Sequence, residues 1–234
     1  MKRIGHKGAD LIAPGNTIAS FEAAVEAGVD MIEFDVLSER PDGTGALVLA
    51  HDYGDLARRR ANGTLLTLAD GLEHLCGTGI DLDLDLKLAG YEDQVVRELR
   101  ERDATARTLI STMEEASLRR VRELAPEIRL GWSVPRVRKD PFRSPFTAVP
   151  AIGMVQVLRR TLPRRCARAI ADGRVEAIMA NVHVVSAAMV RAIDAVGGEL
   201  YVWTVDEEKR IDWLRELGVT GVISNDPRLL QPAK

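Results

Sequence analysis

The sequence predicts an α/β fold, a (β/α)₈ TIM barrel with a small hairpin after strand 2 and an insertion after strand 5. Three observations support this prediction. Strand-like and helix-like segments alternate along the whole chain, the strand-like segments number eight, and 234 residues with 46% hydrophobic content can bury one large core. We expect one domain over residues 1–234. A doubly wound open sheet has the same alternation, so the strand count favours the barrel without excluding the open sheet.

Short apolar runs predict the strands, and apolar residues at helical spacing predict the helices between them. The predicted strands span residues 3–5, 30–36, 80–87, 107–112, 128–133, 176–181, 200–205 and 219–224. The predicted helices span residues 17–27, 94–102, 114–125, 186–196 and 207–217. Asn16 or Thr17 can cap the first helix and Ser186 a later one, while Gly28 and Gly218 can end helices.

Two segments depart from plain alternation. A Pro41-Asp42-Gly43-Thr44-Gly45 turn between apolar residues predicts a hairpin that carries His51 back toward the barrel mouth. Residues 135–168 hold nine Lys or Arg side chains against one acid, Asp140. We interpret this insertion as a solvated surface excursion with a helix. The alternative is a lid or docking surface for anionic headgroups or phospholipid membranes.

Charge and cysteine content exclude several classes of protein. The chain has 32 basic and 35 acidic side chains, and its net charge of −3 produces no overall electrostatic field that would attract nucleic acid. Cys76 and Cys166 have neither metal-ligand spacing nor the density of a disulfide scaffold. No apolar run approaches the roughly 18 residues that span a bilayer, and the first strand begins almost at Met1. We expect a cytoplasmic protein without a nucleic-acid partner, and the sequence carries no signal for an oligomeric state.

The candidate site residues lie at the ends of predicted strands, where the loops of a parallel barrel build its active site. Two histidines, His6 and His51, can supply an acid and a base near neutral pH. Carboxylates at the ends of the second and third strands supply oxygen ligands that suit Mg²⁺ or Ca²⁺ rather than Zn²⁺. These carboxylates are Glu33, Asp35 and Asp85.

The third strand alternates acidic and apolar residues from Asp81 to Lys87. Because strand side chains alternate faces, we expect its acids and Lys87 to point into the barrel and its leucines to lie under the helices. Asp85 lies nearest the rim and can complete a three-carboxylate site. For the two deeper acids, Asp81 and Asp83, we favour a structural role, partly solvated or hydrogen-bonded inside the barrel.

An ordered series of motifs resembles the glycerophosphodiester phosphodiesterase family over most of the chain. The series is specific, although each motif alone would be weak. It consists of Ile4-Gly5-His6-Lys7-Gly8, Pro14-Gly15-Asn16-Thr17, Glu33-Phe34-Asp35, His51-Asp52, Leu84-Asp85-Leu86-Lys87, Ile110-Ser111-Thr112, Ala125-Pro126, Val202-Trp203-Thr204-Val205-Asp206 and Gly221-Val222-Ile223-Ser224-Asn225-Asp226-Pro227.

The resemblance implies a TIM barrel, one divalent cation, Mg²⁺ or Ca²⁺, and hydrolysis of a small-molecule glycerophosphodiester to glycerol 3-phosphate and an alcohol, a reaction of lipid and glycerol metabolism. The implied metal ligands are Glu33, Asp35 and Asp85, the implied acid and base are His6 and His51, and Lys87 is implied to contact phosphate. Lys7 is a second candidate cation. Trp203 offers an apolar face at the mouth, or packs in the core.

Elementary chemistry agrees with these roles. Attack on a phosphodiester increases its negative charge, so a metal ion and fixed cations are needed. Two histidines on opposite sides of phosphorus can move the two protons. Attack by water and attack by the substrate's own glycerol hydroxyl, which gives a cyclic phosphate first, both stay open. For the other histidines, His74 and His183, we expect structural roles.

Three residues depart from the usual family pattern. Lys7 stands in place of Arg and offers phosphate a point charge rather than a planar fork. Gly15 stands in place of Glu, and Asp85 is one methylene shorter than the usual Glu. Two further functions are therefore considered. One is a lysophospholipase D or a lyase similar to sphingomyelinase D that releases a cyclic phosphate, and the other is a noncatalytic glycerol-phosphate-binding module.

Overall fold

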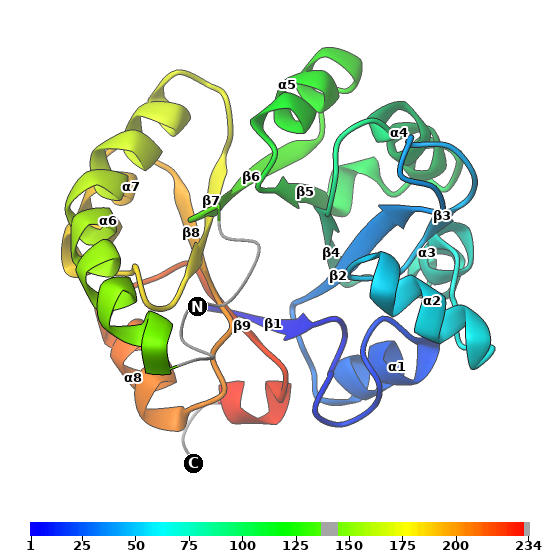
Figure 1. Cartoon of the computed structure of the whole chain (residues 1–234), viewed down its shortest axis with the longest axis horizontal. Coiled ribbons are helices and arrows are strands. Elements are labelled where there is room, and N and C mark those ends of the chain that lie inside the picture. Colours follow the sequence, from blue (N-terminus) through cyan, green and yellow to red (C-terminus); the bar gives the residue numbers. More distant parts are fainter. Residues whose placement is uncertain (137–144, 232–234) are drawn as a thin grey trace.

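The computed structural model describes residues 1–136 and 145–231, and for residues 145–152 the backbone alone. Eight parallel strands run in the order β1-β9-β8-β7-β6-β5-β4-β2, and β1 pairs again with β2 to close a barrel (Figure 1). The predicted (β/α)₈ barrel is confirmed, and the open sheet is excluded. The barrel strands are β1 Lys2–His6, β2 Met31–Ser38, β4 Asp81–Leu86, β5 Thr108–Thr112, β6 Arg129–Val134, β7 Ala177–Asn181, β8 Glu199–Trp203 and β9 Gly221–Ser224.

Helices surround the barrel, and the five predicted ones are confirmed. They are α1 Ile18–Glu26, α4 Glu92–Glu101, α5 Glu115–Leu124, α7 Ala187–Asp194 and α8 Glu208–Leu217. The connection after β2 contains two helices that the sequence analysis missed, α2 Tyr53–Ala61 and α3 Leu68–Cys76. Short 3₁₀ helices lie at Thr105–Arg107 and Pro227–Leu230.

The predicted hairpin is confirmed. Strand β3, Leu47–Val48, pairs antiparallel with the end of β2, with Leu37 opposite Val48. Among the predicted caps, the Thr17 hydroxyl accepts from the Ser20 N–H at 3.2 Å and starts α1. The Asn16 side chain is used elsewhere, as described below.

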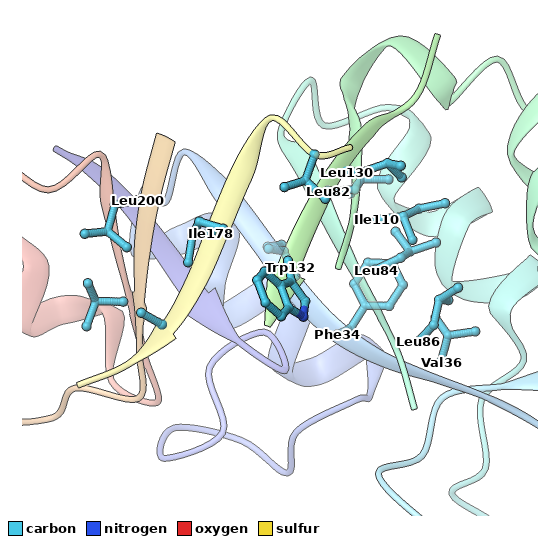
Figure 2. Close-up of a cluster of buried hydrophobic side chains, with 14 of the residues drawn as sticks. Phe34, Val36, Leu82, Leu84, Leu86, Ile110, Leu130, Trp132, Ile178 and Leu200 are labelled. Atoms are coloured by element: carbon cyan, nitrogen blue, oxygen red, sulfur yellow. The ribbon is translucent and has the colours of Figure 1, made fainter. Parts of the chain in front are cut away.

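The core has two layers, which follow from the alternation of side chains along each strand. The leucines of β4 lie in the outer layer between the barrel and the helices, where Leu82, Leu84 and Leu86 are buried beside Phe34 and Ile110 (Figure 2). A smaller cluster fills the inside of the barrel with Ile4, Met31, Leu109, Ala177, Met179, Tyr201 and Ile223. This inner cluster lies below the carboxyl ends of the strands.

Helix α6, Pro145–Ala171, follows the fifth barrel strand and has 27 residues, against eight to ten in the other helices of the described ranges. It packs against α7 along one side of the barrel (Figure 1). The predicted insertion over residues 135–168 therefore contains the expected helix, and its part at 137–144 lies outside the described residues. No helix in the described ranges combines the length and the apolar character needed to cross a bilayer.

Candidate active site

Strand β1 places His6 at the carboxyl rim of the barrel, in register with Glu33 of β2. The two side chains face each other, with 3.8 Å between His6 Nε2 and Glu33 Oε2. Glu33 also accepts from the Lys7 backbone N–H at 2.9 Å. Parallel pairing of neighbouring strand ends thus brings a predicted catalytic residue beside a predicted metal ligand.

The other nitrogen of His6, Nδ1, lies 2.5 Å from Asn225 Oδ1, in the segment after β9. The Asn225 amide nitrogen donates to Asp206 Oδ2 at 2.6 Å, and the Asn225 backbone N–H donates to Asp206 Oδ1 at 2.8 Å. Because the amide nitrogen is held by a carboxylate, the amide oxygen must face the imidazole and accept from Nδ1–H. Neutral His6 therefore carries its proton on Nδ1 and presents an unprotonated Nε2 to the site.

Three carboxylates, Glu33, Asp35 and Asp85, gather beside His6. One oxygen from each lies within 4.8 Å of the others. Register explains the cluster, because Asp35 and Asp85 are paired residues on adjacent parallel strands. The donor set fits a hard divalent cation such as Mg²⁺ or Ca²⁺, which binds carboxylate oxygens. The shorter side chain of Asp85 does not keep it from this group.

Two lysines place positive charge among these acids. The Lys87 ammonium forms ion pairs with both Asp35 and Asp85. The Lys7 ammonium lies 3.6 Å from Asp35 Oδ2. Lys7 has a left-handed backbone conformation, φ 51°, in the turn after β1. Burial of several carboxylates at one point is costly unless cations compensate it, and these lysines provide that compensation.

Asn16 is a site residue that the sequence analysis assigned only to helix capping. Its amide nitrogen donates to Asp35 Oδ2 at 2.9 Å, and its amide oxygen accepts from the Asp35 backbone N–H at 3.1 Å. Both residues are fully buried. The pair fixes the orientation of the Asp35 carboxylate, and the Pro14-Gly15-Asn16-Thr17 motif was the available signal.

The pKa values of these groups shift in opposite directions. Burial, and then the charge of Asp35, raises the pKa of Glu33. Burial also acts on Asp35, but the nearby charges of Lys87 and Lys7 overcome it and lower the pKa of Asp35. Burial, followed by the charge of Lys7, lowers the pKa of His6 below 6.5. The site therefore holds an ionised Asp35 and a neutral His6 near pH 7.

Of the two deeper acids, Asp81 is partly exposed and bonded to the Lys2 ammonium at 2.8 Å, at the opposite end of the barrel. This confirms its structural role. Asp83 is fully buried, so the expectation of partial solvation is wrong for it. Burial, and then the charge of Glu33, raises the pKa of Asp83 well above its ordinary value. Its location opposite Glu33 on the adjacent strand favours the protonated form.

His51 lies after β3, as the hairpin prediction requires, but in a different environment from His6. Its side chain is 53% exposed, against 21% for His6. Its Nδ1 lies 3.1 Å from Asp52 Oδ2, and its backbone N–H donates to Asp55 at 3.1 Å. Burial raises the pKa of Asp85, and the charges of Lys87 and His51 oppose that rise. His51 also adds to the lowering of the Asp35 pKa by Lys87 and Lys7, so the hairpin brings it within electrostatic reach of the acidic cluster.

The structure explains sterically why residue 15 is glycine. A Cβ at residue 15 would lie 2.5 Å from Asp10 Oδ1 and 2.8 Å from Lys7 Cβ. The Gly15 N–H instead donates to Asp10 Oδ1 at 2.7 Å. The loop after β1 therefore keeps a carboxylate, supplied by Asp10 rather than by position 15.

Trp203 ends strand β8 and is partly buried. Its indole N–H donates to the Met179 carbonyl at 3.0 Å, and its ring packs on the inner cluster of the barrel. Core contact, one of its two expected roles, is therefore present. Of the remaining histidines, His74 lies 3.7 Å from Glu22 on the outer helices, as a structural role predicts.

The chain is similar to known proteins in sequence and in fold. The model of the glycerophosphoryl diester phosphodiesterase family matches residues 6–65 and 80–229. A glycerophosphodiester phosphodiesterase from Caldanaerobacter subterraneus is 24% identical, over 97% of this chain and 95% of its own length. A phosphodiesterase of Oleispira antarctica, solved with sn-glycerol-3-phosphate, has a TM-score of 0.73 and 22% identity, over 99% of this chain and 95% of its own.

A glycerophosphodiester phosphodiesterase of Agrobacterium tumefaciens has a TM-score of 0.71 and 19% identity, with 98% of this chain and 99% of that chain covered. The structural likenesses establish the barrel fold, and the family match includes the ends of β1, β2, β4, β8 and β9, where the site residues lie. The chain belongs to the glycerophosphoryl diester phosphodiesterase family.

Proposed function

We propose that this protein is a metal-dependent phosphoric diester hydrolase that cleaves glycerophosphodiesters to glycerol 3-phosphate and an alcohol. The observation that carries the proposal is the convergence of an imidazole, three carboxylates and two ammonium groups at one end of the barrel. Family membership supports the reaction class. The related Oleispira phosphodiesterase was solved with glycerol phosphate, the product expected here.

Glu33, Asp35 and Asp85 would hold one Mg²⁺ or Ca²⁺ ion. When bound, that ion supplies charge neutralisation at the phosphoryl oxygens. Asn16 holds Asp35 in position through two hydrogen bonds. Lys87 and Lys7 would contribute further positive charge to the phosphate as its negative charge grows. Trp203 would offer apolar surface to the alcohol part of the substrate.

The two histidines would divide the proton transfers. His6 Nε2 is unprotonated in the neutral ring and would take the proton from the attacking hydroxyl, whether of water or of the substrate's glycerol. His51, whose Nδ1 lies 3.1 Å from Asp52 Oδ2, would donate a proton to the departing alkoxide. The P–O bond to the alcohol then breaks as a neutral alcohol leaves.

The direct test is hydrolysis of glycerophosphocholine and glycerophosphoethanolamine with Mg²⁺ or Ca²⁺, with glycerol 3-phosphate as the measured product. We expect turnover with at least one of the two ions and loss of turnover in a chelator. The Asp35→Asn variant should lose roughly 10³-fold in rate, because a metal ion contributes several kcal/mol. It should also bind the ion more weakly in calorimetry.

Asp81→Asn is the matched control, because Asp81 is an acid of the same barrel at its opposite end, bonded to Lys2. Its rate should stay within about twofold of the wild type. Absence of glycerol 3-phosphate with both ions, or an equal loss in Asp35→Asn and Asp81→Asn, would contradict the proposal.

A further inference from the structure

The exposed apolar side chains of this protein are unevenly distributed. Among the side chains that the structure describes, seven large hydrophobic ones are exposed. Met1, Val25 and Val196 lie at the start of β1 or near the ends of α1 and α7, which is the end of the barrel away from the site. Leu11, Ile12, Met154 and Val157 form the other group, called here the apolar rim.

Leu11 and Ile12 lie in the loop after β1, at the mouth of the barrel. They are 65% and 38% exposed, although they are consecutive apolar residues. The Leu11 backbone N–H donates to the Asn225 carbonyl at 3.0 Å, which fixes this loop beside the segment that holds His6. The loop therefore projects apolar side chains from a fixed backbone next to the active site.

Met154 and Val157 lie on α6 and are 42% and 60% exposed. A contact of Arg159 shows where this part of the helix lies along the barrel axis. The Arg159 guanidinium donates to the His183 carbonyl at 2.9 Å. His183 follows the carboxyl end of β7, so residue 159 is level with the barrel mouth. Helices of a barrel run antiparallel to its strands, and the residues of α6 before 159 therefore extend beyond the mouth.

The buried face of α6 agrees with this geometry. Its fully buried side chains, Leu162, Cys166 and Ala169, recur at helical spacing and cover the barrel below the mouth. Leu158 is partly buried against the core, so the core still faces the helix at this level, and the exposed Val157 lies on another side of the helix.

The charge of α6 identifies the partner. The helix contains five arginines at positions 159, 160, 164, 165 and 168 and no acidic residue, although the whole chain carries a net charge of −3. Three of them contact other parts of the protein, Arg159 at the His183 carbonyl, Arg165 over the Trp132 ring and Arg168 at Asp172, which leaves the exposed Arg160 and Arg164 to meet a partner. Apolar side chains that project beside arginines fit an interface where hydrocarbon lies next to anionic groups. The surface of a phospholipid membrane is an interface of this kind. Nucleic acid would use the arginines and leave the apolar side chains in water.

We propose that the apolar rim and the arginines of α6 dock the barrel mouth onto an anionic phospholipid membrane. Leu11, Ile12, Met154 and Val157 enter the boundary between headgroups and acyl chains, and the exposed Arg160 and Arg164 face the lipid phosphates. The active site then opens toward the membrane surface, where lipid-derived phosphodiesters are concentrated. Docking does not depend on catalysis, so it is measured without substrate.

The test is co-sedimentation of the whole protein with vesicles of phosphatidylcholine alone or mixed with phosphatidylglycerol. We expect binding to the mixed vesicles that weakens as salt is raised. Leu11→Ser with Val157→Ser should lower the partition coefficient by roughly tenfold or more, because two large apolar side chains no longer insert. Val25→Ser with Val196→Ser is the matched control, with similar chemistry at the opposite end, and should stay within about twofold.

Three results would overturn the proposal: no binding to the anionic vesicles, an equal loss in the two double variants, or a dimer in light scattering that the rim substitutions dissociate. Hydrogen exchange of the wild-type protein gives an independent readout that needs no variant. Vesicles should protect the segments around residues 11 and 157 and leave those around residues 25 and 196 unchanged. Hydrolysis of soluble glycerophosphocholine, measured in parallel, tests the proposed activity separately.

Discussion

His6 and His51 are two imidazoles near one acidic cluster, but the protein holds them in contrasting ways. His6 ends a central strand, is largely buried, and donates to a neutral amide, Asn225. His51 follows a two-residue hairpin strand, is more than half exposed, and faces a carboxylate, Asp52. A buried ring with a neutral partner favours the uncharged base, which leaves the exposed His51 as the candidate acid. We propose that this contrast divides the two proton-transfer roles between the histidines.

The largest effect is expected at the buried histidine. His6→Ala should lower kcat by about 10²–10⁴-fold on every glycerophosphodiester, because a general base acts whatever the leaving group. Steady-state kinetics on two esters with different alcohols, together with thermal unfolding to confirm the fold, would check this. A loss confined to one ester would mean that His6 is not the common base.

A smaller effect is expected at the residue that orients His6. Asn225→Leu should lower kcat by roughly tenfold, the value of one hydrogen bond that aligns the ring. The pH profile separates positioning from a general structural loss. The neutral His6 ring is the active form, and burial lowers its pKa. On the acid limb of the pH profile, kcat of the wild type should therefore fall only below pH 6.5.

The hydrogen bond from His6 to Asn225 raises the pKa of His6, opposing that effect of burial. Its loss in Asn225→Leu should therefore move the acid limb to still lower pH. A limb that stays in place or moves upward would contradict the assigned orientation of the amide.

The exposed histidine should depend less on its partner. Asp52→Asn keeps an acceptor for the Asp55 N–H that starts α2, but removes the charge beside His51. Because exposed ion pairs contribute little, kcat should fall by only about two- to fivefold. A loss larger than that of Asn225→Leu would reverse the contrast between the two histidines.

The smallest effect is expected at a histidine outside the mouth. His74 contacts Glu22 at the surface of the outer helices. His74→Ala should leave kcat within about twofold and change the free energy of unfolding by less than about 1 kcal/mol. This variant serves as the control for the loss of any imidazole, and a large loss of activity would weaken the assignment of function to the mouth alone.

Much of the fold was predictable, because it depends on local patterns. Apolar runs and helical spacing gave the eight barrel strands and five of the helices. Helix α2 was not predicted because Leu56 is its only buried side chain, so its sequence has almost no apolar face. Helix α3 does show the pattern, with Leu68, Leu72 and Leu75 buried at helical spacing. The overlooked Thr67 cap marks its start.

The sequence predicted the site residues that lie at strand ends. It did not predict the contacts between side chains from segments that are distant in the sequence. Glu33, Asp35 and Asp85 converge because strand register aligns them. The hydrogen bond from His6 to Asn225 depends on β9 lying beside β1, which a linear sequence does not display. The ion pairs of Lys87 with two acids likewise require the closed barrel.

The division of roles between the histidines is tested most directly by changing the leaving group. On glycerophosphocholine, His51→Ala should lose about 10²–10⁴-fold in kcat, because the departing alkoxide needs a proton. On glycerophospho-p-nitrophenol, whose leaving group departs without one, His51→Ala should retain nearly the wild-type rate while His6→Ala stays inactive. Equal losses of His51→Ala on the two esters, or recovery of His6→Ala instead, would contradict the account.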